Sequence, residues 1–240
     1  MIGALVRRLS HFLILSDDDK RILRDAIVRV EKFDAHQDII RENEKPDYVH
    51  LIVEGWACRY KYLEQGQRII LGYLIPGDLC DVHIALLDHM DHSIGTLTPV
   101  TIALIPRETA NQIFESSTKL ARAFFWTALI EESTLREWFA NNNGRSAEKR
   151  LAHLFCEMQV RYRAAGLAHD NHSDFPLVQA ELADALGISV VHTNRVLQKL
   201  RKEGMITLAG KRLTIIDWER LRDFAEFDPS YLHLSEDILK

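Results

Sequence analysis

The sequence predicts an α+β protein in which short antiparallel strands come first, a long helix follows, and smaller helices with one hairpin come last. Apolar residues alternate with polar ones through much of the first 105 residues. From about residue 107 to residue 141 they recur at spacings of three and four. A two-residue period indicates half-buried strands, and the longer spacing indicates a helix. The change of period therefore separates a sheet-forming half from a helical half.

Composition and charge restrict the class of protein. The chain has 240 residues, of which 47% are hydrophobic and 27% charged, which is typical of a globular chain with one large domain or two small ones. Its longest apolar runs, such as residues 12–15, have four residues, whereas a membrane span needs about 18. The first residues lack the apolar run of a signal peptide, and Cys58, Cys80 and Cys156 lie far apart. We therefore expect a cytoplasmic protein without a membrane segment or a disulfide framework.

The first part of the chain is predicted to contain helices followed by short strands. Ser16 and the acidic residues 17–19 form a helix start, and this helix is expected to continue to Ile27. The expected strands cover residues 49–53, 56–62, 68–75 and 100–104. The third of these ends at the Pro-Gly-Asp of residues 76–78, which is a turn signal. Such a set of strands is typical of an antiparallel sandwich or roll.

A single long helix is expected from about residue 107 to residue 141, because no Pro or Gly interrupts residues 108–143. Six of its side chains recur at alternating spacings of three and four: Ala121, Phe124, Ala128, Glu131, Leu135 and Trp138. Such a seam either faces the same helix of a second chain or packs on the sheet of its own chain. The Asn-Asn-Asn-Gly of residues 141–144 ends the helix. These boundaries predict three parts, residues 1–115, 116–143 and 144–240.

Positive charge is concentrated near the end of the chain. Residues 145–216 hold eleven basic and seven acidic side chains, although the whole chain has a net charge of −5. From residue 189 to residue 212 there are six basic side chains and one acidic one. A basic surface of this kind suits a polyanionic partner such as nucleic acid.

Two short helices joined by a tight turn are predicted within this region. Residues 179–186 form the first helix, Gly187 permits the turn, and Ser189 caps a second helix that runs to about Lys202. One face of the second helix is expected to be buried: Thr193, Val196, Leu197 and Leu200. The opposite face carries Val191, Asn194, Arg195, Gln198 and Lys202.

The outward face has the chemistry of a helix that reads bases in the DNA major groove. Arginine can bond guanine, asparagine can bond adenine, and valine methyls can pack on thymine methyls. The hairpin of residues 205–216 carries a basic tip that is expected to contact phosphates. A generic helical hairpin with solvated basic residues is the alternative, but the glycine spacing, the outward face and the hairpin agree with one another. The candidate DNA-binding residues are Gln179, Ser189, Val190, Val191, His192, Asn194, Arg195, Lys199, Lys211 and Arg212.

Three segments resemble the Crp/Fnr-type transcription regulators, in a branch common in alphaproteobacteria. They are the Gly-Arg-Ser-Ala-Glu-Lys-Arg-Leu-Ala-His-Leu of residues 144–154, the Ser-Val-Val-His-Thr-Asn-Arg of residues 189–195, and the tail over residues 217–229. The resemblance spans nearly the whole chain. It implies a cyclic-nucleotide-binding-like β-roll, a dimerisation helix and a C-terminal winged helix-turn-helix. It also implies a homodimer on a palindromic promoter site of double-stranded DNA and the recruitment of RNA polymerase.

The β-roll segment departs from the members of this family that bind cyclic AMP. Those members carry a Gly-Glu pair, and then an arginine that holds the cyclic phosphate. Here Asp81 and Val82 follow the turn, and residues 82–105 contain no Arg or Lys to hold a phosphate. Glu131 places a carboxylate where those members place hydroxyls, and no cysteine precedes Cys58 to hold the iron–sulfur cluster of Fnr-like members. We therefore expect no cyclic AMP response, no such cluster and no cofactor; the small-molecule effector stays open.

A segment rich in histidine and aspartate follows the turn. His83, His89 and His92 lie with three aspartates within twelve residues, a set that could bind Zn, Fe or Mn. Because no defined ligand spacing appears, an exposed polar loop with its histidines bonded to the backbone is the favoured interpretation. The alternative to a regulator is a metal-binding β-roll enzyme or metal sensor with an accessory DNA-binding module. Cys80 and Cys156 are candidates for redox sensitivity, although single cysteines are more often small core residues.

Overall fold

A computed structural model describes residues 2–168, 171–235 and 238 of the chain. The chain forms two compact units, Met1–Glu132 and Ser133–Lys240. The helix α4, Thr118–Gly144, contributes to both units, because the boundary falls within it. Among the described residues, no helix is both long enough and apolar enough to cross a membrane.

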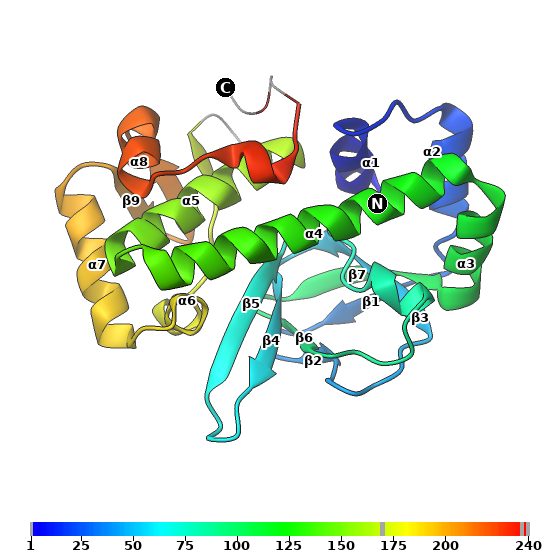
Figure 1. Ribbon diagram of the computed structural model, residues 1–240, viewed down its shortest axis with the longest axis horizontal. Coiled ribbons are helices and arrows are strands. Elements are labelled where there is room, and N and C mark those ends of the chain that lie inside the picture. The colour runs from blue at the N-terminus through cyan, green and yellow to red at the C-terminus, as the bar shows by residue number, and fades with distance from the viewer. Residues whose placement is uncertain (1, 169–170, 236–237, 239–240) are drawn as a thin grey trace. The chain divides into compact units, whose positions relative to one another are not determined.

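The N-terminal unit is built on two antiparallel sheets (Figure 1). The first has three strands in the order β1 (Arg29–Phe33), β7 (Val100–Pro106) and β3 (Tyr48–Glu54). The second has four strands in the order β2 (Asp38–Ile40), β6 (Ser93–Thr96), β4 (Ala57–Tyr62) and β5 (Arg68–Leu74). Buried aliphatic side chains from both sheets, such as Leu51 and Ile94, belong to one hydrophobic core. Burial of this apolar surface stabilises the roll.

Helices precede and follow the strands of this unit, and one short helix lies between β5 and β6. They are α1 (Gly3–Ser10), α2 (Asp17–Asp25), the short 3₁₀ helix η1 (Val82–Ala85), α3 (Arg107–Ser116) and the first part of α4. The helix α2 begins with a capping box, in which the Ser16 hydroxyl accepts the backbone N–H of Asp19 and the Asp19 carboxylate accepts the backbone N–H of Ser16. The predicted start of this helix is therefore confirmed, and it ends two residues before Ile27.

The single helix expected over residues 107–141 is wrong, because the structure divides it into α3 and α4. Ser117 has an extended backbone, with φ −132° and ψ 95°. Its hydroxyl accepts the backbone N–H of Leu120 at 3.3 Å. A serine in this position starts a new helix even where no Pro or Gly breaks the sequence. The end of α4 at Gly144 lies where the sequence predicts it.

The predicted α+β class, with antiparallel sheets first and helices later, is confirmed. The strands β3, β4, β5 and β7 lie where the alternating pattern predicts them. The sequence analysis missed β1, β2 and β6. The first of these is mostly exposed, and the other two have only three and four residues. Strands so short, or with so few buried side chains as β1, show no alternation of apolar and polar residues.

The C-terminal unit packs helices around α5 (Ala147–Ala164), which is buried along most of its length. Its other elements are α6 (Gln179–Leu186), α7 (Val190–Lys202), α8 (Trp218–Ala225), η2 (Pro229–Leu232) and an antiparallel sheet in the order β8 (His172–Asp174), β10 (Arg212–Ile215) and β9 (Ile206–Ala209). Residues of α6, α7 and α8 all contact α5. The helix α5 is therefore the centre of this unit.

A buried carboxylate joins three segments of the C-terminal unit. Glu157 of α5 is completely buried and accepts hydrogen bonds from Trp138 Nε1 at 2.9 Å and from the Tyr231 hydroxyl at 2.8 Å. Arg161 Nη1 lies 3.2 Å from the same carboxylate. The backbone carbonyl of Tyr231 also accepts the Ser133 hydroxyl at 2.7 Å. These bonds attach the end of α4 and the chain near η2 to α5.

Candidate nucleic-acid interface

The turn between α6 and α7 is fixed by the residues within it. Gly187 has φ 64°, a left-handed conformation that glycine adopts without strain. Ser189 caps α7, because its hydroxyl accepts the backbone N–H of His192 at 3.2 Å. The Thr193 hydroxyl donates to the Ser189 carbonyl at 3.1 Å. The direction in which α7 leaves the turn is therefore set locally.

The rotation of α7 about its axis is set by four buried side chains, Thr193, Val196, Leu197 and Leu200. These are the four that the sequence pattern assigns to the inner face. Since their burial fixes the helix, the opposite face must point to solvent. Arg195, Gln198 and Lys202 are exposed on that face.

The first turns of α7 expose apolar side chains beside an unpaired cation. Val190 and Val191 are 47% and 62% exposed. Arg195 is exposed and forms no ion pair or hydrogen bond with any residue that the structure describes. Exposed valines are unfavourable in water but match thymine methyls, and a free guanidinium matches guanine O6 and N7. The arrangement suits a helix whose N-terminal end enters the major groove.

Besides Ser189, three of the predicted contact residues are engaged within the protein. Asn194 is half-buried, and its Nδ2 donates to Gln179 Oε1 at 3.0 Å. Lys199 Nζ lies 3.5 Å from a carboxylate oxygen of Glu148. The bond between Asn194 and Gln179 joins α7 to α6 and fixes both amides. The sequence pattern could not reveal these partners.

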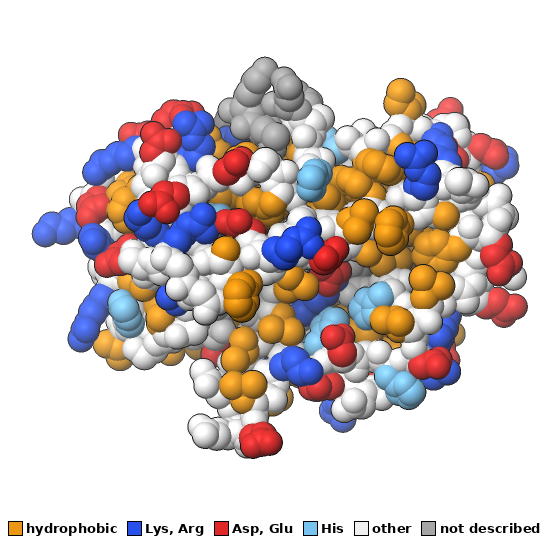
Figure 2. Space-filling view, in the orientation of Figure 1, with side chains coloured by type: hydrophobic (Ala, Val, Ile, Leu, Met, Phe, Trp, Pro, Cys, Tyr) orange, Lys and Arg blue, Asp and Glu red, His pale blue; other side chains and the backbone are white. Residues whose placement is uncertain are grey.

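The strands β9 and β10 form a hairpin with a basic turn. Gly210 and Lys211 both have positive φ, 57° and 62°, as a two-residue type I′ turn requires. Lys211 and Arg212 are exposed. Lys and Arg side chains also gather in Figure 2 along the edge of this unit where Figure 1 shows α7. These charges accompany the proposed base-reading face and can meet phosphates.

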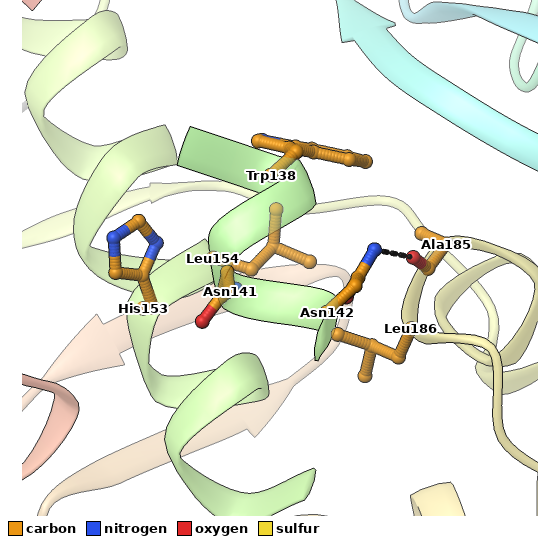
Figure 3. A pocket seen from close by; sticks show the side chains of 7 residues that line it. All are labelled: Trp138, Asn141, Asn142, His153, Leu154, Ala185 and Leu186. Atoms are coloured by element: carbon orange, nitrogen blue, oxygen red, sulfur yellow. Dashed lines mark hydrogen bonds between the residues drawn. The ribbon is translucent and has the colours of Figure 1, made fainter. Parts of the chain in front are cut away.

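The end of α6 is bonded to α4 and α5 beside the turn (Figure 3). Asn142 Nδ2 donates to the carbonyl of Ala185 at 3.2 Å, and Arg150 Nη1 donates to the carbonyl of Leu186 at 3.1 Å. These bonds satisfy carbonyl groups that have no partner at a helix end. The side chains labelled in Figure 3 line a cavity of about 10 Å³, which has room for about one water molecule. This region therefore positions α6 and is too small to hold an effector.

The N-terminal unit contains a buried arginine that the sequence analysis missed. Arg59 lies in β4, outside residues 82–105, and its Nη2 donates to the carbonyl of Cys80 at 2.9 Å. Its guanidinium also meets Glu131 through two contacts, Nη2 to Oε2 at 2.9 Å and Nε to Oε1 at 2.8 Å. The expected seam residue Glu131 therefore points to Arg59. This carboxylate therefore offsets the charge of the buried guanidinium.

The histidine-rich segment is not the exposed, backbone-bonded loop that the sequence favours. His89 is exposed, but His83 is half-buried and His92 is only 7% exposed. The Nε2 atoms of His83 and His92 are buried and have no hydrogen-bond partner in the part of the chain that the structure describes. Within those residues, no group of three or more His, Cys, Asp and Glu side chains is placed to hold a metal ion. The burial of two of the three histidines corrects the expected loop.

Cys80 and Cys156 are completely buried. Burial raises the pKa of both thiols, and the nearby Asp81 charge raises the pKa of Cys80 further. The thiolate is the reactive form of cysteine. Neither side chain therefore has the surroundings of a redox sensor.

The predicted seam on α4 is wrong at two positions. Phe124 and Trp138 are 2% and 8% exposed, because Phe124 packs edge-on against Phe114 and Trp138 bonds to Glu157. The large apolar side chains that α4 does expose are Phe125, Leu129, Leu135 and Phe139. Three of these, Phe125, Leu129 and Phe139, follow directly after residues that the pattern selected, and Leu135 is itself one of the selected residues. The exposed stripe is thus rotated relative to the predicted one.

Comparison with known proteins identifies the two units separately. Residues 30–117 match the cyclic nucleotide-binding domain, and residues 149–224 match the Crp-like helix-turn-helix domain. The transcriptional activator protein FnrL of Cereibacter sphaeroides is 26% identical over 216 residues, which cover 88% of this chain and 86% of FnrL. The nitrogen fixation regulation protein FixK of Bradyrhizobium diazoefficiens is 23% identical over 80% of each chain. A solved structure of FixK2 from Bradyrhizobium japonicum shares the fold, with a TM-score of 0.74 at 20% identity over 82% of this chain and 96% of that one.

The β-roll, the long helix and the helix-turn-helix with its small sheet define a DNA-binding transcription regulator. The chain belongs to the Crp/Fnr-type transcription regulators, with relatives in the alphaproteobacterial branch, and the resemblance in the sequence is confirmed. It binds DNA through the helix-turn-helix domain and is not an enzyme. The alternative of a metal-dependent enzyme is therefore wrong.

Proposed function

We propose that the protein is a homodimeric regulator that reads a palindromic DNA site through α7 and acts without cyclic AMP and without an iron–sulfur cluster. In this proposal residues 1–115 form the sensor, residues 116–143 the dimerisation helix and residues 144–240 the DNA-binding part. The observation that carries the DNA-reading role is the start of α7, where Val190 and Val191 are exposed beside the unpaired Arg195. Such a surface gains contacts in a groove that it lacks in water.

We assign different roles to α7 and to the hairpin. Arg195 bonds guanine in each half-site, and Val191 packs on a thymine methyl. Ser189 and His192 lie at the capped start of α7, where base contacts begin. Lys211 and Arg212 contact phosphates from the β9–β10 turn, which positions the domain without reading sequence.

The experiment compares Arg195→Ala with Lys211→Ala on a selected palindrome and on a scrambled duplex at several salt concentrations. Arg195→Ala should cost about 1 to 3 kcal/mol per half-site on the palindrome and relax the preference at one base pair. Lys211→Ala should weaken binding to both duplexes alike and lower the salt slope by about one unit. Arg24→Ala removes an exposed charge from α2 and is the matched control. Full discrimination by Arg195→Ala, together with its loss in Lys211→Ala, would refute the assignment of α7 to the groove.

The dimer is proposed to form through the exposed stripe of α4. Phe125, Leu129, Leu135 and Phe139 are each at least 42% exposed. Each large apolar side chain left in water costs about 1.5 to 3 kcal/mol relative to burial, which favours pairing with the same helix of a second copy. The two α7 helices should then lie about 34 Å apart, to meet successive turns of the major groove.

Light scattering at micromolar concentration tests this interface. Wild-type protein should be a dimer, and Phe125→Glu with Phe139→Glu should be a monomer of unchanged far-UV circular dichroism. Leu63→Glu, at an exposed position near the β4–β5 turn, is the control and should remain dimeric. A monomeric wild type, or a dimeric double variant, would contradict the proposed interface.

We propose that the N-terminal unit does not bind cyclic AMP, because the guanidinium of Arg59 already forms an ion pair with Glu131. Isothermal titration should give no saturable heat with micromolar cyclic AMP. A stoichiometric heat would show that the ion pair opens and that the proposal is wrong. Iron analysis of protein purified without oxygen should likewise find no cluster, since the three cysteines are buried and too few for four thiolates.

We also propose that the DNA-bound dimer recruits RNA polymerase. The relative FnrL is named a transcriptional activator, and the shared domain order supports the same output for this chain. Run-off transcription from a template with the selected palindrome upstream should increase when protein is added. Arg195→Ala should abolish the increase, and repression of the template would contradict an activating role.

A further inference from the structure

Two imidazoles with unsatisfied ring nitrogens lie together in the N-terminal unit. His83 belongs to η1, and His92 directly precedes β6. Their ring centroids are 5.9 Å apart, and the rings are tilted by 41°. The Nε2 atom of each ring is buried and has no hydrogen-bond partner among the described residues. Buried polar atoms without partners are rare, so two side by side indicate that something else satisfies them.

The protonation of His92 is fixed by its neighbour. His92 Nδ1 lies 2.7 Å from Asp91 Oδ1. A carboxylate oxygen at this distance accepts the proton that the ring carries on Nδ1. The buried Nε2 of His92 therefore carries a lone pair, which requires a Lewis acid or a hydrogen-bond donor.

We propose that His83 and His92 bind a Zn²⁺ ion through their Nε2 atoms, with Asp91 orienting the imidazole of His92. Neutral imidazole is a preferred zinc ligand, and a carboxylate on the opposite ring nitrogen is the usual support for such a ligand. Because the described residues offer no third protein ligand at this place, water or a small anion completes the coordination. The proposal adds a ligand class to the sensor unit and is independent of the proposed reading of DNA.

The separation of the two rings suits one bound ion. Two imidazoles bound to one tetrahedral Zn²⁺ at about 2.0 Å place their ring centroids about 5 Å apart. The observed separation of 5.9 Å is close to this value. The positive charge of Arg59 does not oppose the ion strongly, because Glu131 neutralises it. A water molecule that donates to both nitrogens is the competing occupant.

Zinc titration of the full-length protein, stripped of metal and competing with a chromophoric chelator, tests the site. Wild type should bind one Zn²⁺ per chain with saturation. His83→Gln and His92→Gln should each weaken binding at least tenfold, and Asp91→Asn should weaken it about tenfold through the lost orientation of His92. His89→Gln changes an exposed histidine of the same segment, and its affinity should stay within twofold of wild type.

The outcomes separate a metal site from a bound water molecule and from a folding defect. No saturable binding by wild type, or equal affinity of wild type and His83→Gln, would overturn the proposal in favour of water. Equal losses in His89→Gln and His92→Gln would place the metal on surface histidines and overturn it too. Melting of the metal-free variants monitors folding. If His92→Gln unfolds, the test rests on the half-buried His83 through His83→Gln. NMR should then show a zinc-induced shift of the His83 ring nitrogens in wild type, and its absence would contradict the proposal.

Discussion

Substitutions that remove the charge of Arg59 or of Glu131 test whether this ion pair stabilises the buried guanidinium of the β-roll. The Arg59 side chain is 10% exposed and the Glu131 side chain 28%. Glu131→Gln preserves the size of the side chain but removes its negative charge. The buried guanidinium of Arg59 then keeps only neutral acceptors, including the carbonyl oxygens of Leu79 and Cys80. Arg59→Met leaves a carboxylate that water can partly reach. The first substitution should therefore be the more harmful one.

The expected losses follow from this burial. Breaking a fully buried ion pair costs about 3 to 5 kcal/mol, whereas an exposed pair contributes under about 1 kcal/mol. For this pair we expect the unfolding free energy of the N-terminal unit to fall by about 3 kcal/mol in Glu131→Gln and by about 2 kcal/mol in Arg59→Met. The double substitution leaves no unpaired ion and should cost about 2 kcal/mol. The coupling energy of the pair is then about 3 kcal/mol.

Native-state hydrogen exchange on the full chain, in graded urea, measures these values locally. Peptides from β4 and β5 report on the N-terminal unit, and peptides from α5 are the internal control. The α5 peptides should keep their exchange free energies within about 0.5 kcal/mol. A coupling energy below about 0.5 kcal/mol in β4 would refute the conclusion that Glu131 neutralises Arg59.

Further predictions concern the C-terminal unit. Burial lowers the pKa of His153 to about 4 from 6.5. Between these two pH values the unfolded chain binds a proton at this histidine and the folded chain does not. The free energy of unfolding should therefore be about 2 kcal/mol lower at pH 5 than above pH 6.5. Urea unfolding across this range should show the loss in wild type and a flatter profile in His153→Gln. Tyr231→Phe should cost about 1.5 to 3 kcal/mol, because the buried Glu157 loses a charge-assisted hydrogen bond, and an unchanged urea midpoint would contradict this. Gly187→Ala forces a side chain into the left-handed region and should cost about 1 kcal/mol, measured as faster exchange of α6 and α7 amides.

The DNA-reading helix could be predicted well from the sequence because its signals are local. Gly187, Ser189 and the spacing of the apolar residues on α7 determine the turn, the cap and the rotation of the helix without distant contacts. The engagement of Asn194 with Gln179 joins two different helices and leaves no trace in the periodicity of either. The inner and outer faces of α7 could therefore be predicted from the sequence. Whether a polar side chain on the outer face is already hydrogen-bonded within the protein could not.

The helix α4 shows why a heptad pattern alone selects the wrong side chains. It carries apolar residues on more than one face, since Phe124 is buried while its neighbour Phe125 is 64% exposed. The buried and exposed apolar residues lie at adjacent positions of the helix, so the pattern alone does not show which of two neighbours faces the core. The choice depends on partners such as Phe114, which lies in the preceding helix. Only tertiary packing decides which of the two aromatic residues faces the core.

Arg59 illustrates the same limit at the site that decides ligand chemistry. The alternation through Cys58 and Tyr60 places Arg59 on the other face of β4, and a polar residue on such a face normally points to solvent. In the structure Ala57, Cys58, Arg59 and Tyr60 are all buried. A strand covered on both faces has no solvent face, so a two-residue period carries no information about which side chains are buried. Its partner Glu131 is 72 positions away, so a search of residues 82–105 could find neither member of the pair. The proposed lack of a cyclic AMP response therefore rests on a different physical feature, the ion pair between the buried Arg59 and a carboxylate of α4.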